Sequence, residues 1–73
     1  MISMNHKLIA SGTNDNVQIF LECWNYETYT LSIHEVGKGT IHEDFDSMVW
    51  SCQKFFETCR QYGVEPKKEM LYI

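Results

Sequence analysis

The chain has 73 residues and a formal net charge of −4, and 44% of its residues are hydrophobic and 14% aromatic. This length accommodates one domain, residues 1–73, and it excludes a repeat array or a large enzyme. The aromatic content is too high for a disordered chain, and no apolar stretch is long enough to cross a bilayer. Because the sequence opens without an apolar leader and cleavage site, we expect a cytoplasmic protein.

The first two strands are expected near the start of the chain. Residues 6–10 form a plausible strand, and the polar, glycine-containing residues 11–16 predict a turn after it. Residues 17–24 alternate strictly between apolar and mixed positions, which is typical of a half-buried strand. One face of that strand carries Val17, Ile19, Leu21 and Cys23, and the other carries Gln18, Phe20, Glu22 and Trp24.

A third strand is expected over residues 28–36, where Tyr29, Leu31 and Ile33 share a face. Cross-strand partners in a hairpin share a face, so the register must place apolar residues opposite one another. Pairing Leu21 with Leu31 does this, and it leaves residues 25–27 as a three-residue loop. A two-residue loop would place Leu21 opposite Thr30 instead, so we predict the longer loop.

The third strand should end at the glycines of residues 37–39, with residues 40–43 as a short extension before a long helix. The helix is predicted by apolar residues spaced three and four apart. Asp44 or Asp46 is the expected N-cap, and Gly63 is placed for a left-handed C-terminal cap before Pro66. The predicted stripe consists of Phe45, Met48, Cys52, Phe55, Cys59 and Tyr62, widened by Val49 and Phe56.

These elements predict a two-layer α+β domain in which an antiparallel sheet of three to four strands packs on one long C-terminal helix. The order is β-β-β-α, and residues 69–73 could add a final edge strand or cross to a partner. The strand order in the sheet stays open. In arrangement the domain resembles the three-strand-plus-helix core of double-stranded-RNA-binding domains and of HicB-type antitoxins, and it carries no motif of either family.

The charge balance argues against nucleic-acid binding. Ten acidic residues oppose six basic ones, and Lys67 and Lys68 are the only adjacent basic pair. A nucleic-acid-binding surface needs a basic field that displaces phosphate counterions. We therefore expect neither a nucleic-acid nor a membrane partner.

A metal site is the first chemistry to weigh. Cys23, Cys52, Cys59, His34 and His42 are of the residue types that bind zinc. Cys52 and Cys59 lie about 10 Å apart along the predicted helix axis, however, and no Cys-x-x-Cys pair is present. An odd number of cysteines at predicted core positions indicates reduced, buried thiols. We expect no metal and no cofactor, with a zinc-binding regulator as an alternative.

No arrangement of residues predicts catalysis. The core thiols lack the exposed, electropositive setting that a nucleophilic cysteine needs, and the glycines at 37 and 39 lack the spacing of a phosphate-binding loop. We expect that the chain is not an enzyme.

The acidic residues Glu43, Asp44 and Asp46 could bind a divalent cation or a basic partner, but capping of the helix is the favoured interpretation. His34, on the outer strand face, is expected to be a solvated surface residue.

The strongest functional signal is aromatic surface. Trp50 is predicted on the helix face opposite the core, beside the polar residues Lys54, Glu57 and Gln61. Phe20 and Trp24 should point away from the helix, with Tyr26 in the adjoining loop. Clustered exposed aromatics are typical of interfaces, although the ends of the chain could instead fold over them. The predicted interface residues are Phe20, Trp24, Tyr26 and Trp50.

We therefore expect a small non-enzymatic protein–protein interaction module, a homodimer that modulates or inhibits a partner protein. Small acidic single-domain chains without catalytic residues are typical of phage-encoded or mobile-element-encoded inhibitors. A metal-binding regulator, or a small-ligand sponge or sensor with an aromatic pocket between protomers, is the alternative.

Overall fold

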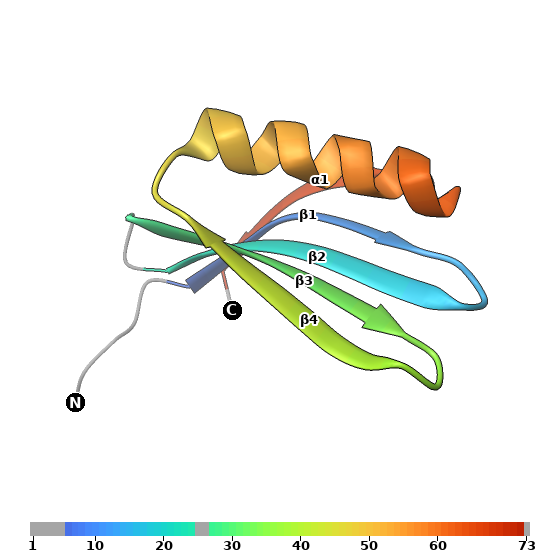
Figure 1. Cartoon of the computed structure of the whole chain (residues 1–73). Helices are drawn as coiled ribbons and strands as arrows, with labels where there is room; N and C mark the ends of the chain where they lie inside the picture. Colours follow the sequence, from blue (N-terminus) through green and yellow to red (C-terminus); the bar gives the residue numbers. More distant parts are fainter. Residues whose placement is uncertain (1–5, 25–26, 73) are drawn as a thin grey trace.

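The computed structural model describes residues 6–24 and 27–72, and for residues 68–72 it describes the backbone alone. A five-stranded antiparallel sheet has the strand order β4-β3-β2-β1-β5, and one helix lies across one of its faces (Figure 1). The elements are β1 (His6–Thr13), β2 (Val17–Trp24), β3 (Thr28–Glu35), β4 (Gly39–Phe45), α1 (Met48–Tyr62) and β5 (Lys67–Tyr72). The predicted two-layer α+β domain with a final strand is confirmed, and its sheet has five strands where three to four were predicted.

The β2–β3 hairpin has the predicted register. Leu21 pairs with Leu31, Ile19 pairs with Ile33, and Trp24 pairs with Thr28 at the loop. The amide of Glu27 donates to the carbonyl of Trp24 and closes the hairpin. Residues 25 and 26 of the loop lie outside the described residues.

The first strand is longer than predicted. β1 continues through Ser11, Gly12 and Thr13, which pair with β2, so the turn is confined to residues 14–16. The Asn14 side chain explains how so short a turn is closed, because its Oδ1 accepts hydrogen bonds from the amides of Asn16 and Val17. A bulge between Leu8 and Ala10 shifts the register of β1.

The segment expected as a short extension is a full strand. β4 pairs with β3 along its whole length, from Gly39 opposite Glu35 to Phe45 opposite Tyr29. Phe45 therefore belongs to the sheet and not to the helix stripe. The glycines at 37 and 39 both have positive φ, near 80°, and they allow the tight connection between the two strands.

The helix begins one residue later than a cap at Asp46 would require, and three residues later than a cap at Asp44 would require. Ser47 is the N-cap, and its side chain accepts a hydrogen bond from the amide of Trp50 at 3.3 Å. The prediction of Asp44 or Asp46 as the cap is wrong, since Asp44 lies within β4 and Asp46 lies before the cap. At the other end Gly63 has the predicted left-handed conformation, and its amide donates to the carbonyl of Arg60.

The core lies between α1 and the covered face of β2 and β3. Phe55, Ile19 and Leu21 are completely buried, and the buried residues of β2 are those predicted from its alternation. Met48 and Val49 are 45% and 71% exposed, so these two members of the predicted helix stripe do not join the core. They lie in the first turn of the helix, where the sheet beneath them ends at Phe45.

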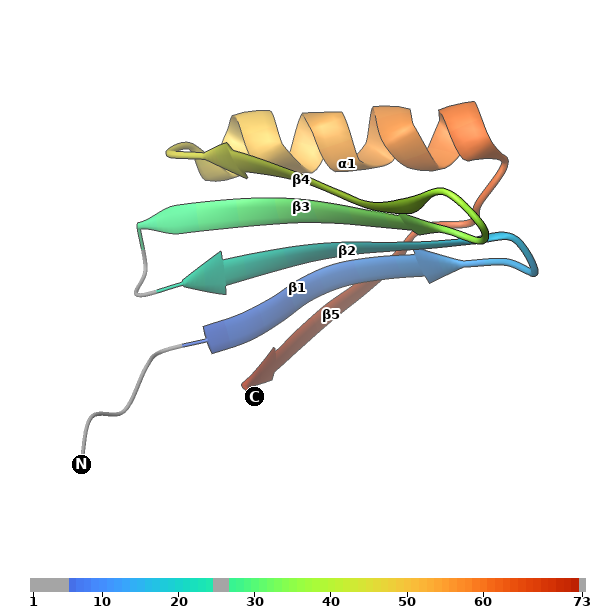
Figure 2. The same ribbon diagram turned by 60° about the horizontal axis from the view of Figure 1, so that its bottom comes forward.

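The last strand pairs with the first. β5 runs antiparallel to β1 at the edge of the sheet, so β1 lies between β2 and β5 (Figure 2). The expected edge strand at residues 69–73 thus begins earlier, at Lys67, and residue 73 lies outside the described part. Among the described residues, no helix has the length and apolar content needed to cross a membrane.

Candidate functional site

The sheet face opposite α1, called here the open face, carries hydroxyl, carboxylate and imidazole side chains and two aromatic rings. Within the described residues no helix or strand covers it (Figure 1). Cross-strand partners share a face, so the register defines its members. They are His6, Leu8, Ser11 and Thr13 of β1, Gln18, Phe20, Glu22 and Trp24 of β2, Thr28, Thr30, Ser32 and His34 of β3, Thr40, His42 and Asp44 of β4, and Lys67 of β5.

All three histidines of the chain lie on the open face. His6 stacks on Trp24, with ring centroids 3.7 Å apart and planes inclined by 9°. His6 also pairs through Nε2 with the carboxylate of Glu22, which lies two residues before Trp24 on β2. The indole is half-buried as a result, and its position is determined by a neighbouring strand.

Phe20 is held in a similar way by the third strand. Its ring meets His34 edge to face, at a centroid distance of 6.1 Å. His34 in turn shares a hydrogen bond of 2.7 Å through Nδ1 with the Thr40 hydroxyl on β4. His34 is therefore a bonded member of the open face, in addition to being exposed to solvent as expected.

Two further hydrogen bonds link β3 and β4 across the open face. The Thr30 hydroxyl donates to the Asp44 carboxylate at 2.8 Å, and Ser32 shares a 3.0 Å hydrogen bond with His42. Among the described residues, every buried side-chain nitrogen and oxygen has a hydrogen-bond partner. These hydrogen bonds restrict the side chains of the open face, and restricted side chains lose less entropy when a ligand binds.

The structure separates the predicted interface residues. Phe20 and Trp24 lie on the open face and are half-buried, whereas Trp50 lies on the helix and is 66% exposed. Tyr26 lies outside the described residues. Trp50 borders a shallow hollow of about 530 Å³ with Phe45, Asp44, Asp46 and Thr28. Because Thr28 is the cross-strand partner of Trp24, this hollow adjoins the open face at the loop end of the sheet.

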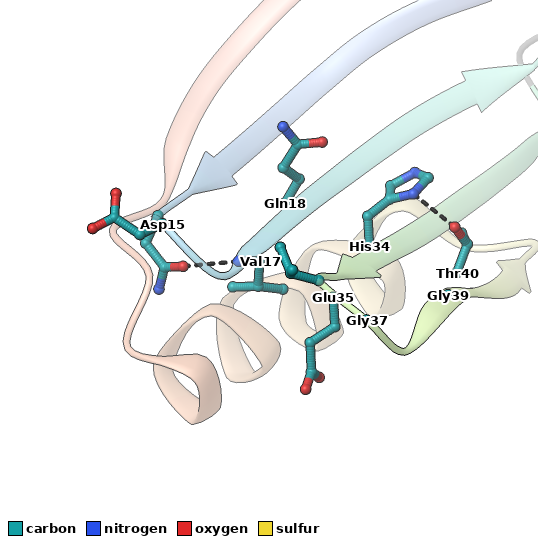
Figure 3. A pocket seen from close by; sticks show the side chains of 10 residues that line it. Asp15, Val17, Gln18, His34, Glu35, Gly37, Gly39 and Thr40 are labelled. Carbon is teal, nitrogen blue, oxygen red and sulfur yellow. Dashed lines mark hydrogen bonds between the residues drawn. The ribbon is translucent and has the colours of Figure 1, made fainter.

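A second hollow, of about 430 Å³, lies between the β1–β2 and β3–β4 turns. Figure 3 shows that its side chains do not converge on one point. Gln18 and His34 belong to the open face, whereas Val17 and Glu35 pair on the covered face. Asp15 projects from the turn. A small ligand would find no group of polar atoms directed toward a common centre there.

The cysteines occupy the other side of the sheet. Cys23 and Cys59 are buried, Cys52 is half-buried, and all three are free thiols. Burial raises the pKa of the Cys59 thiol and so favours its neutral form, whereas the thiolate is the form that attacks electrophiles and binds metal. Within the described part of the chain, no three His, Cys, Asp or Glu side chains are placed to hold a metal ion together.

The sequence interpretation missed the roles of His6, His42 and Glu22. The spacing of Glu22 and Trp24 could have indicated the role of His6. These two residues share a strand face, so a single residue of the neighbouring strand can contact both the carboxylate and the indole. His42 could not be placed because β4 was not recognised as a strand. No family model, curated protein or solved structure matches the chain.

Proposed function

We propose that this chain is a non-enzymatic protein-interaction module that contacts a partner protein through the open face and thereby modulates it. The observation that carries the proposal is the pair of aromatics on the open face, Phe20 and Trp24, each held by a histidine from a neighbouring strand. Ordered aromatic side chains are enriched among residues that contribute most to binding energy.

The chemistry of the open face favours a protein partner. Hydroxyl, imidazole and carboxylate groups surround the two rings, and this mixture is typical of the polar surround of an interface. Among the described residues, Glu22 and Asp44 place two carboxylates on this face against the single lysine Lys67, so the face lacks the basic field that a phosphate backbone needs. A partner with a basic or hydrogen-bonding surface around an apolar centre would be complementary.

Site-specific photocrosslinking tests the proposal in the cells that produce the chain. A photoreactive phenylalanine derivative replaces Gln18, which is exposed on the open face. The expected result is a covalent adduct with another protein, and the additional change Trp24→Ala should lower its yield about tenfold, as loss of a key aromatic contact would.

The matched control places the same derivative at Gln61, which is exposed on the helix. An adduct yield at position 18 no higher than that at position 61 would contradict the proposal. Circular dichroism of Trp24→Ala separates loss of contact from loss of folding.

A further inference from the structure

β4 ends the sheet with an unpaired backbone. Within residues 6–24 and 27–72, β3 is its only strand neighbour. Its pairing with β3 runs from Gly39 to Phe45 without a register shift, so the strand is regular along its whole length. Alternate residues of such a strand direct their N–H and C=O groups outward, where another strand can pair with them.

The two edges of the sheet differ in how they are protected. Edge strands are commonly protected from pairing by lysine, proline or a bulge. β5 begins with Lys67 and Lys68 directly after Pro66, whereas β4 has the sequence GTIHEDF with neither lysine nor proline. The charges of β4 itself, Glu43 and Asp44, lie in its second half, so its first half is the less protected part of this edge.

An apolar side chain near the middle of β4 lacks cover. Ile41 pairs with Ile33 on the face that carries α1, yet it is 60% exposed because the helix does not extend over it. Ile33 itself is packed against the core. A strand added beside β4 would place its own side chains next to Ile41 and remove apolar area from water.

The charges at the two ends of β4 are of opposite sign. Lys38 precedes the strand and forms a 3.0 Å ion pair with Glu35 of its own chain, but its side chain stays 75% exposed, and Glu43 and Asp44 lie toward the other end of the strand. Pairing with a parallel copy would place carboxylates beside carboxylates. Pairing with an antiparallel copy places the lysine of each chain near the carboxylates of the other, which is favourable.

We propose that two copies of this chain associate by antiparallel pairing of β4 with β4, about a two-fold axis at Ile41. In that register Ile41 meets Ile41 of the second copy, and Lys38 lies opposite Asp44 of the second copy. The two sheets then form one continuous sheet with a helix from each chain on the same side. The inference rests on the proposed interaction function and deepens it by naming a second copy as a partner, at the β4 edge that borders the open face.

Sedimentation equilibrium of the purified full chain, from low micromolar to near-millimolar concentration, tests this inference. Pairing of one strand buries less area than a standard interface, so we expect reversible association. The mean mass should rise from monomer to dimer with concentration. Ile41→Lys, which adds a charge at the axis, should raise the dissociation constant about tenfold or more. Val49→Lys is the matched control, since Val49 is 71% exposed on the helix and should not alter association.

A charge exchange tests the register. Lys38→Glu and Asp44→Lys should each weaken self-association, because each places like charges opposite one another at positions 38 and 44 of the two copies. An equimolar mixture of the two variants should associate again as a mixed dimer. Asp44 accepts a hydrogen bond from Thr30 within the chain, so urea unfolding of each variant confirms that it is folded.

A monomer at all concentrations, an unchanged dissociation constant for Ile41→Lys, or a mixture that associates no better than its components would overturn the inference. If Trp24→Ala dissociates the dimer and Ile41→Lys does not, the copies meet through the open face. That result would contradict pairing of β4 and leave the proposed interaction function standing.

Discussion

Gly12 of β1 lies directly beneath Val64, the first residue after the helix cap, and a Cβ at position 12 would come within 2.6 Å of Val64 Cγ1. The same Cβ would lie 3.2 Å from the carbonyl oxygen of Glu65. The chain leaves the helix across β1 at this point, so the glycine permits the close approach of two backbone segments.

We predict that Gly12→Ala lowers the free energy of unfolding by about 1–3 kcal/mol, as measured by urea denaturation, because the new methyl group forces the two segments apart. Val64→Ala removes the side-chain atom nearest to the new methyl group. It should therefore lower the free energy of unfolding less in the Gly12→Ala background than in the natural protein. Full additivity of the two changes would show that these residues are not in contact.

The helix cap allows a direct comparison between the expected and observed N-terminus. Ser47→Ala should destabilise the protein by about 1 kcal/mol, because the amide of Trp50 loses its acceptor. Asp46→Ala should change stability by less than about 0.5 kcal/mol, as is usual for an exposed residue outside a cap. A larger loss for Asp46→Ala than for Ser47→Ala in urea denaturation would place the cap at Asp46.

The two faces of the helix should respond very differently to truncation. Phe55 is completely buried, so Phe55→Ala should cost about 3–5 kcal/mol or prevent folding. Trp50 is 66% exposed, and Trp50→Ala should change the free energy of unfolding by less than about 1 kcal/mol. A loss of several kcal/mol for Trp50→Ala in chemical denaturation would mean that the indole is packed.

Stability should fall in alkaline solution. Burial raises the pKa of Cys59 above its usual value near 9, and desolvation followed by the neighbouring Cys23 raises the pKa of Tyr29 above 10. Both groups favour their neutral forms in the folded state. Their contribution to the free energy of unfolding is therefore fully present below pH 9 and is lost as the pH rises through the folded-state pKa values. Urea unfolding at a series of pH values measures the decline.

The variant Cys59→Ala provides the control for the alkaline effect. It removes one of the two titrating groups, so its stability at neutral pH is lower but the decline with rising pH is shallower. An equal decline in the variant and the natural protein would assign the effect to other groups.

The stacking of His6 on Trp24 covers one face of the indole. In a Trp50→Phe background, where Trp24 is the only tryptophan, we predict that His6→Ala increases the quenching of its fluorescence by acrylamide. His42→Ala is the control, because His42 bonds to Ser32 and not to the indole. Equal quenching of both variants would contradict the stacked arrangement.

The β2–β3 hairpin was predictable because one of its faces is buried. Leu21 and Leu31 could be aligned in a single register, since a shift by one residue would have placed the two leucines on opposite faces of the sheet. The helix and its terminal glycine were predictable for the same kind of reason, as Phe55 and Cys59 repeat at the helical period.

β4 was not predictable from its pattern. Six of its seven residues are exposed, so neither face carries the apolar alternation that identifies a strand. The open face depended on that strand, because His34 finds Thr40 and Ser32 finds His42 only across the β3–β4 pairing. The end of β1 was missed because Gly12 indicates a turn locally, whereas its actual cause is the close approach of Val64.

The position of β1 between β2 and β5 has a consequence for how the protein folds. The pairings among β1, β2, β3 and β4 join neighbours in the chain, and each can form as a hairpin once its two strands exist. The pairing of Ser11 with Lys67 instead closes a loop that contains the hairpins and the helix. Its entropy cost is the largest of the four, so we expect β5 to dock after the other strands. Until it does, the outer edge of β1 is open to another nascent chain, and slow release from the ribosome would favour aggregation at that edge.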